Sequence, residues 1–144
     1  MWLDQATSDN TAKWTWSNAN VEHSITSDGC LVENTGSNNR YIIPTSNGTQ
    51  ITVTSTDNYC FEVDLKNVDA TFLRLFFLEK GFDILSSLST TEFNTFKIEN
   101  TGTTVKCYLN GTQISSQTAT ASSSAISIGF NNKFIFKNAK IYPI

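Results

Sequence analysis

The sequence predicts an all-β protein, an antiparallel sandwich of two β-sheets, and three observations lead to this expectation. The first is composition: 20 Thr, 16 Ser and 15 Asn accompany a charged fraction of only 16%. Threonine favours strands, whereas serine and asparagine favour turns. The second is an alternation of apolar and polar residues with period two from about residue 40, the pattern of half-buried strands. The third is a turn signal about every 8–12 positions, which is the spacing of a β-sandwich.

Length, composition and net charge limit the size of the domain and the kinds of partner that the protein can have. A chain of 144 residues with a hydrophobic fraction of 39% suits a single β-sandwich domain over residues 1–144, alone or as a module of a longer protein. The net charge of -3, with lysines dispersed along the chain, argues against nucleic acid as a partner. The first residues lack the pattern of a signal peptide, and no apolar run is long enough for membrane insertion.

The middle of the chain is predicted to form several short strands. Residues 39–46 form a strand that Pro44 ends, and in residues 50–55 Ile51 and Val53 share one face. Residues 58–65 alternate strictly, so that one face carries Tyr59, Phe61, Val63 and Leu65 and the other carries Cys60, Glu62 and Asp64.

Residues 71–81 are the most apolar run and are interrupted only by Arg74. Such a run predicts a strand that is covered on both faces, or one that lines a groove. Residues 82–88 are predicted to be a further strand, with a short helix within 82–92 as the alternative.

Residues 94–116 predict two successive β-hairpins. Asn110-Gly111 is the preferred pair for a type I′ turn, because both central residues need positive φ. This turn pairs Cys107 with Ile114, and a turn at Thr101-Gly102 pairs Phe96 with Cys107. One face is then predicted to carry Phe96, Ile98, Val105, Cys107, Leu109 and Ile114, and the other Lys97, Glu99, Lys106, Tyr108 and Gln113.

The two ends of the chain complete the predicted sandwich. Residues 124–130 and 133–144 predict a final strand pair around a turn at Asn131-Asn132, after a polar loop at 115–125. Near the N-terminus, Trp2, Trp14 and Trp16 are expected to supply a terminal strand and to close the mouth of the sandwich.

The three cysteines, Cys30, Cys60 and Cys107, are widely spaced and form no CxxC motif. We expect three reduced core thiols, with one disulfide and a spare thiol as the alternative. His23 is the only histidine, and it is expected to lie at the surface or at a strand end. No cofactor is expected; a calcium site built from Asp28 or Asp57 with carbonyl oxygens is the weaker alternative.

The segment "FKIENTGTTVKCYLNGTQI" resembles part of the concanavalin A-like jelly rolls, which include lectin, laminin-G and glycosidase-like sandwiches. The closing "ISIGFNNKFIFKNAKIYPI" is similar to the last strands of such modules in phage tail and virion appendage proteins and in prokaryotic surface adhesins. The resemblance spans about residues 58–144. It implies a jelly roll whose ligands bind on the concave face or at edge loops, without implying catalysis.

Within this family, the laminarinase-like glycosidases use a strand that carries three carboxylates. Glu62 and Asp64 match the first two, but residues 65–67 are Leu, Lys and Asn. Without the second glutamate there is no nucleophile and acid pair, so we expect that the chain is not an enzyme. The remaining role of Asp64 is a predicted cross-strand ion pair with Arg74.

We therefore expect a carbohydrate-binding recognition or attachment module, on a virion appendage or a prokaryotic cell surface, as part of a larger protein. Aromatic rings stack on sugars while polar side chains bind the hydroxyls. The candidate ligand contacts are Trp14, Trp16, Arg74 and Tyr108. The alternatives are a purely structural assembly domain, in which an oligomer or a neighbouring structural protein covers the apolar 72–78 strand, and a glycoside hydrolase.

Overall fold

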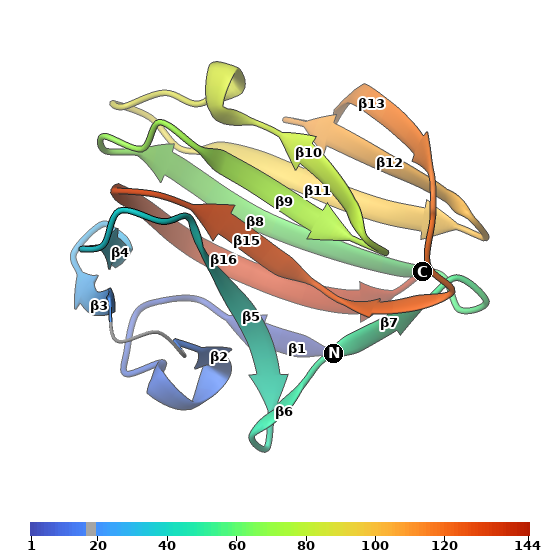
Figure 1. The fold of residues 1–144 in the computed structure, drawn as a ribbon, viewed down its shortest axis with the longest axis horizontal. Helices are drawn as coiled ribbons and strands as arrows, with labels where there is room; N and C mark the ends of the chain where they lie inside the picture. The colour runs from blue at the N-terminus through green and yellow to red at the C-terminus, as the bar shows by residue number, and fades with distance from the viewer. Residues whose placement is uncertain (17–19) are drawn as a thin grey trace.

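The structure, a computed structural model, describes residues 1–16 and 20–144 and consists of two packed antiparallel β-sheets and a short ribbon (Figure 1). The larger sheet has eight strands. Its order is β13 (Thr112–Thr118), β12 (Thr104–Leu109), β11 (Asn94–Thr101), β8 (Tyr59–Asn67), β16 (Lys133–Pro143), β4 (Gly29–Asn34) and β3 (Val21–Thr26), with β1 (Trp2–Asp4) also paired to β16.

The smaller sheet has six strands. Its order is β10 (Lys80–Asp83), β9 (Leu73–Phe77), β15 (Ser127–Phe130), β5 (Arg40–Ser46) and β2 (Trp14–Thr15), with β6 (Thr49–Gln50) paired to β5. The ribbon joins β14 (Ser123–Ala125) to β7 (Thr52–Thr54), and two 3₁₀ turns, η1 (Thr11–Lys13) and η2 (Leu85–Ser87), lie in the connections. The predicted two-sheet β-sandwich of the jelly-roll kind is confirmed.

The core fills the space between the two sheets with the inward residues of every alternating strand. The burial of these side chains is the main force that holds the sheets together. The larger sheet contributes Phe61, Val63, Leu65, Phe96, Ile98, Phe134 and Phe136, and the smaller sheet contributes Ile42, Leu73, Leu75, Phe77, Ile128 and Phe130, all at most 1% exposed.

The hairpins of β11, β12 and β13 confirm the predicted facing of the side chains except at Ile114, and the register of β11 with β12 differs from the prediction. The pairs are Phe96–Leu109 and Ile98–Cys107, two residues away from the prediction. Since side chains alternate with period two, this shift leaves Cys107 inward, and it is fully buried. Asn110 and Gly111 have φ of 49° and 87°, as a type I′ turn requires.

Ile114 does not lie on the core face, contrary to our prediction. A β-bulge between Cys107 and Tyr108 pairs Cys107 with Ser115 instead, and Ile114 is 45% exposed. The extra residue of the bulge reverses the facing of the strand beyond it.

The apolar run at 71–81 is a hairpin rather than a strand covered on both faces. Strand β9 ends at Phe77, and Leu78 and Glu79 turn the chain with φ of 51° and 62°. Both alternatives for residues 82–88 are realised in part, because β10 reaches Asp83 and η2 follows it. The turn was missed because neither of its central residues is Gly or Asn.

Pro44 does not end its strand either, since β5 continues to Ser46. The pairing of β5 with β15 stops at Ile42, so the missing N–H of Pro44 interrupts no ladder with that strand. The Pro44 carbonyl accepts a hydrogen bond of 2.9 Å from the Ile51 N–H, which draws the chain into the next strand.

The N-terminal segment is fastened by a buried carboxylate. Asp4, 6% exposed, accepts hydrogen bonds from the backbone N–H of Ala6 (2.8 Å), the amide of Asn10 (2.9 Å) and the indole of Trp14 (2.8 Å). Trp14 itself packs against Phe136, with ring centroids 5.0 Å apart. Trp2 lies in the terminal strand β1, as the sequence predicted, and Trp14 fills the core beside it.

Candidate functional site

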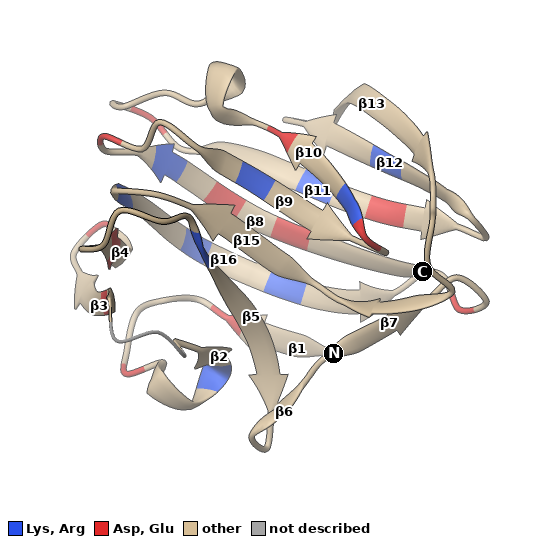
Figure 2. Ribbon diagram, in the orientation of Figure 1, with Lys and Arg blue, Asp and Glu red and all other residues tan. Residues whose placement is uncertain are grey.

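The outer face of the larger sheet carries an ordered set of polar side chains across four adjacent strands, β16, β8, β11 and β12. Strand register places the residues in two neighbouring rows. We call this set the polar array; its rows are Lys140, Glu62, Lys97 and Tyr108, and Tyr142, Cys60, Glu99 and Lys106. Figure 2 shows where the lysines and the acidic residues lie along these strands.

A local irregularity in β16 brings its two array residues, Lys140 and Tyr142, to the outer face of the sheet. The register with β8 shifts between Lys137 and Lys140, where Asn138 has φ of 52°. Ala139 thereby turns inward and Lys140 and Tyr142 turn outward, whereas an unbroken alternation would have placed both inside the core.

Glu62 contacts two other side chains of the array. Its Oε2 lies 3.1 Å from Nζ of Lys140, and its Oε1 accepts a hydrogen bond of 2.6 Å from the Tyr142 hydroxyl. Burial acts to raise the pKa of Glu62, but the hydrogen bonds from Tyr142 and Lys140 and the charge of Lys140 together lower it. Glu62 is therefore an ionised acceptor rather than a proton donor at neutral pH.

Glu99 repeats this arrangement on the neighbouring strand β11. Its Oε1 accepts a hydrogen bond of 2.9 Å from the Tyr108 hydroxyl, and its Oε2 lies 3.6 Å from Nζ of Lys97. The Lys97 ammonium also lies 4.5 Å from the centroid of the Tyr108 ring. The hydrogen bond to Glu99 raises the pKa of Tyr108. Each carboxylate thus holds one tyrosine and one lysine in a fixed position.

Cys60 belongs to the array by register but is fully buried. Burial raises the pKa of its thiol to about 11. A thiol that stays protonated at neutral pH is a poor nucleophile, so Cys60 fills space beneath the array. All three cysteines are free and buried, as predicted.

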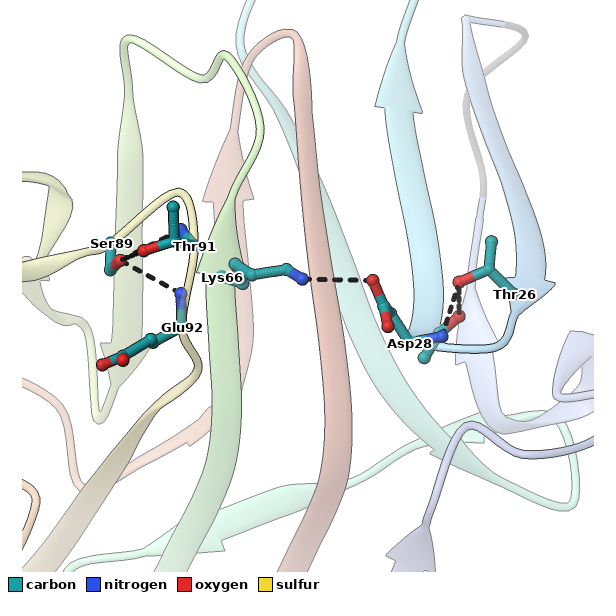
Figure 3. Close-up of polar contacts among 7 residues, drawn as sticks. Thr26, Asp28, Lys66, Ser89, Thr91 and Glu92 are labelled. Carbon is teal, nitrogen blue, oxygen red and sulfur yellow. Dashed lines mark hydrogen bonds and ion pairs between the residues drawn. The ribbon is translucent and has the colours of Figure 1, made fainter.

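A pocket of about 310 Å³ lies beside the array, where β16 meets the turn between β3 and β4. Phe93, Lys137 and Asp28 line it, and the Lys137 ammonium lies 4.2 Å from the centroid of the Phe93 ring. Lys66 reaches from β8 to Asp28, with Nζ 3.1 Å from Oδ2 (Figure 3). We call this the Phe93 pocket.

The predicted ligand contacts are not brought together by the fold. Trp14 is 3% exposed, which removes it from the surface, and Trp16 stacks on His23 with ring centroids 3.7 Å apart. Of the four candidates, only Tyr108 lies in the polar array. His23, expected at the surface or at a strand end, lies within β3 and is half-buried.

Arg74 lies on the opposite side of the sandwich, on the outer face of the smaller sheet. The predicted ion pair with Asp64 is therefore wrong: Asp64, in the larger sheet, bonds to Thr95 (2.6 Å) and Asn138 (2.8 Å). The alternation pattern could not show that β8 and β9, though consecutive, belong to different sheets. Beside Arg74, Tyr41 and Phe76 pack edge to face over Gly129.

Sequence reasoning missed most of the array because its residues are isolated in the sequence. Glu62 was considered for catalysis and for its place on a strand face beside Asp64. Lys97, Lys140 and Tyr142 lie in the two segments that resemble concanavalin A-like jelly rolls, but they were not among the candidate ligand contacts. The hairpin pattern did predict that Lys97, Glu99 and Tyr108 share the outer face of the sheet, and this was the part of the site that the sequence could reveal. The register across β16 and β8 was needed to join them to Glu62.

Among the described residues, neither a group of metal-ligand side chains nor a membrane-spanning helix is found. Residues 1–16 and 20–144 bring no three His, Cys, Asp or Glu side chains into a metal-binding group. Asp57 bonds to Thr54, and Asp28 to Lys66. No helix within these described residues is long and apolar enough to cross a membrane.

No protein-family model and no curated protein matches this sequence. Solved structures of similar fold include the carbohydrate-binding module CBM66 from Bacillus subtilis, 14% identical with a TM-score of 0.66 over 90% of this chain and 94% of that one. A Bacillus subtilis protein of unknown function with a galectin-like fold has 9% identity and a TM-score of 0.71, over 99% and 94%. The alginate lyase from Corynebacterium sp. has 10% identity and a TM-score of 0.63, over 100% of both chains.

These likenesses correct one prediction and confirm another. The prediction that the chain is not an enzyme is wrong, because the same fold is that of an alginate lyase, and the missing glycosidase carboxylate excludes only one kind of chemistry. The chain has a galectin-like, concanavalin A-like β-sandwich fold, as the sequence resemblance implied, and this fold is shared with a carbohydrate-binding module.

Proposed function

We propose that the protein binds carbohydrate through the polar array on the outer face of the larger sheet. The observation that carries this proposal is the combination, across four adjacent strands, of two tyrosines with carboxylates and ammonium groups that hold them. The fold shared with a carbohydrate-binding module supports it.

The chemistry of the array suits the hydroxyl groups of a glycan. Each hydroxyl both donates and accepts, and the array offers carboxylate acceptors beside ammonium donors. The Lys97 and Lys140 side chains are 33% and 40% exposed, so a ligand can reach them. Each ammonium has three donor hydrogens and bonds to one carboxylate, which leaves capacity for a sugar.

Recognition at a prokaryotic cell surface or on a phage or virion appendage, within a larger protein, is the setting that we propose. This setting rests on the resemblance of residues 58–144 to modules of such proteins. The competing proposal is a structural assembly domain whose partner is a neighbouring protein or a second copy.

A glycan array combined with size-exclusion chromatography tests the function. We expect the wild-type monomer to bind one or more glycans, and Lys97→Met and Tyr108→Ala to weaken that binding. Tyr41→Ala is the matched control, because Tyr41 is 44% exposed on the smaller sheet. If no glycan on the glycan array binds and the protein elutes as a stable oligomer, the assembly domain is favoured instead.

A further inference from the structure

The four strands of the polar array carry a charge opposite to that of the whole protein. Strands β8, β11, β12 and β16 contain six lysines, namely Lys66, Lys97, Lys106, Lys133, Lys137 and Lys140, against Glu62, Asp64 and Glu99. Six minus three gives +3 on these strands, whereas the chain has -3 in total, so the remaining residues carry -6.

All nine of these charged residues face outward, because the alternate positions of the same strands are buried in the core. The four strands are adjacent in the sheet (Figure 2), so the outward-facing lysines lie on the same face as the three acidic residues. Lys66 and Lys133 are paired with Asp28 (3.1 Å) and Glu33 (3.6 Å) from outside these strands, so six lysines against five carboxylates leave +1. A positive excess on one face of an acidic protein attracts anions to that face.

The Phe93 pocket adds a place where one anionic group can be held. Lys66 lies 3.1 Å from Asp28 and thus balances the carboxylate in the pocket lining. Lys137 has no carboxylate within 4 Å among the described residues, and its ammonium lies over the Phe93 ring instead. The pocket therefore presents an ammonium without an anionic partner beside an aromatic face.

The size of the pocket fits a small group rather than an extended chain. Its volume of about 310 Å³ lies at the lower end of small-molecule sites, which run from about 300 to 1,000 Å³. An aromatic ring can pack against the apolar face of a sugar while the ammonium binds its acidic substituent.

From these observations, and resting on the proposed function, we infer that the ligand is an anionic glycan, with one acidic sugar residue seated in the Phe93 pocket. Lys137 binds the carboxylate or sulfate of that residue, and Phe93 packs against its ring. The lysines of the array contact the acidic groups of the neighbouring sugars.

The test is affinity electrophoresis of the protein in gels with single polysaccharides. Polygalacturonate, alginate and hyaluronan supply carboxylates, chondroitin sulfate supplies sulfate as well, and dextran, mannan and methyl-esterified polygalacturonate are neutral. We expect at least one anionic polysaccharide to retard the protein, with weaker retardation as salt is raised, and no neutral polysaccharide to do so as strongly.

Three substitutions locate the site. Lys137→Met should weaken binding about tenfold or more, because it removes a charge-assisted hydrogen bond. Lys137→Arg keeps the charge and should retain binding. Lys80→Met, on the smaller sheet, is the control for a simple change in net charge and should bind like the wild type.

The outcomes separate this inference from the proposed function. If a neutral glycan binds as tightly and Lys137→Met leaves binding unchanged, the inference fails while carbohydrate binding stands. If no polysaccharide in the panel retards the protein, both fail. If single-stranded DNA binds as tightly, with the same loss in Lys137→Met, the face is a nucleic-acid site and the inference is overturned.

Discussion

The Tyr142 hydroxyl donates a hydrogen bond of 2.6 Å to Oε1 of Glu62, across the pairing of β16 with β8. The same carboxylate lies 3.1 Å from the Lys140 ammonium, so the three side chains form one unit at the β16 end of the polar array. The unit exists because the irregularity at Asn138 turns Lys140 and Tyr142 to the outer face.

This unit makes stability depend on pH at both ends of the range. The folded-state pKa of Glu62 is lowered from its ordinary value of 4.5, because the bonds from Tyr142 and Lys140 outweigh burial. The stabilisation that ionised Glu62 gives to the folded protein is therefore fully present above pH 4.5, and it is lost as the pH falls through the lowered pKa. Burial, Cys60 and Glu62 raise the pKa of Tyr142 above its ordinary 10.0. The stabilisation that the protonated Tyr142 hydroxyl gives to the folded protein is therefore complete below pH 10, and it declines as the pH rises further.

We predict that Tyr142→Phe lowers the free energy of unfolding by about 1 kcal/mol at neutral pH, the usual value of such a hydrogen bond. It should also reduce the loss of stability above pH 10, since the titrating phenol is gone. Urea unfolding across pH measures both effects, with Tyr41→Phe on the smaller sheet as the control. An alkaline decline of equal size in wild type and Tyr142→Phe contradicts this assignment.

The Asp4 carboxylate should be needed for the N-terminal segment to dock. Asp4→Asn keeps one oxygen acceptor but replaces the other with an NH2 donor, which then faces either the Ala6 N–H or the N–H groups of Asn10 and Trp14. We predict a loss of about 3 kcal/mol on urea unfolding, in the range for a broken buried network. Asp9→Asn, on an exposed carboxylate that accepts hydrogen bonds from the N–H and hydroxyl of Thr11, should change stability by less than about 1 kcal/mol. Equal losses in the two variants would refute the buried network.

The β12–β13 turn permits a separation of backbone and side-chain effects. Gly111 has φ of 87° with open space around its Cα, so Gly111→Ala should cost about 1 kcal/mol through backbone strain alone. Asn110→Gly keeps the turn but removes the bonds of the Asn110 side chain to Thr95 (2.9 Å) and Asn94 (3.0 Å). We expect a loss of about 1–2 kcal/mol there as well. If thermal unfolding shows Asn110→Gly to be neutral, the turn alone fixes the hairpin.

The cysteines should be inert in the folded protein. Burial raises the pKa of Cys30 and Cys60 to about 11 and that of Cys107 to about 12, so each remains a protonated thiol near pH 8. A colorimetric thiol titration should detect none in the native state and all three in denaturant. One thiol that reacts at once without denaturant would show that its strand opens locally.

The sequence predicted the faces of the strands better than their partners. Cys107 was placed correctly although the register of its hairpin was two residues off, because a shift of two preserves the facing. Ile114 was assigned to the wrong face because a one-residue bulge changes the direction in which its side chain points. No sequence pattern indicates such a bulge. Arg74 and Asp64 were paired wrongly because alternation does not say which sheet a strand joins.

The site was harder to predict than the fold for the same reason. Tyr108 and Glu62 were both noted from the sequence, but they lie in one row only because Lys97 of β11 pairs with both. The pairing of β11 with β8 depends on the tertiary structure and could not be predicted from the sequence. Lys140 and Tyr142 depended on the irregular turn of β16 at Asn138, a residue with no special neighbours in the sequence. Phe93 lies outside every predicted strand.

The most direct test of carbohydrate binding at the polar array is amide chemical-shift mapping with the glycan that binds most tightly. We predict that the shifted signals cluster on β8, β11, β12 and β16, around Glu62, Lys97 and Tyr142. Shifts that cluster instead around Tyr41, Arg74 and Phe76, on the outer face of the smaller sheet, would contradict it.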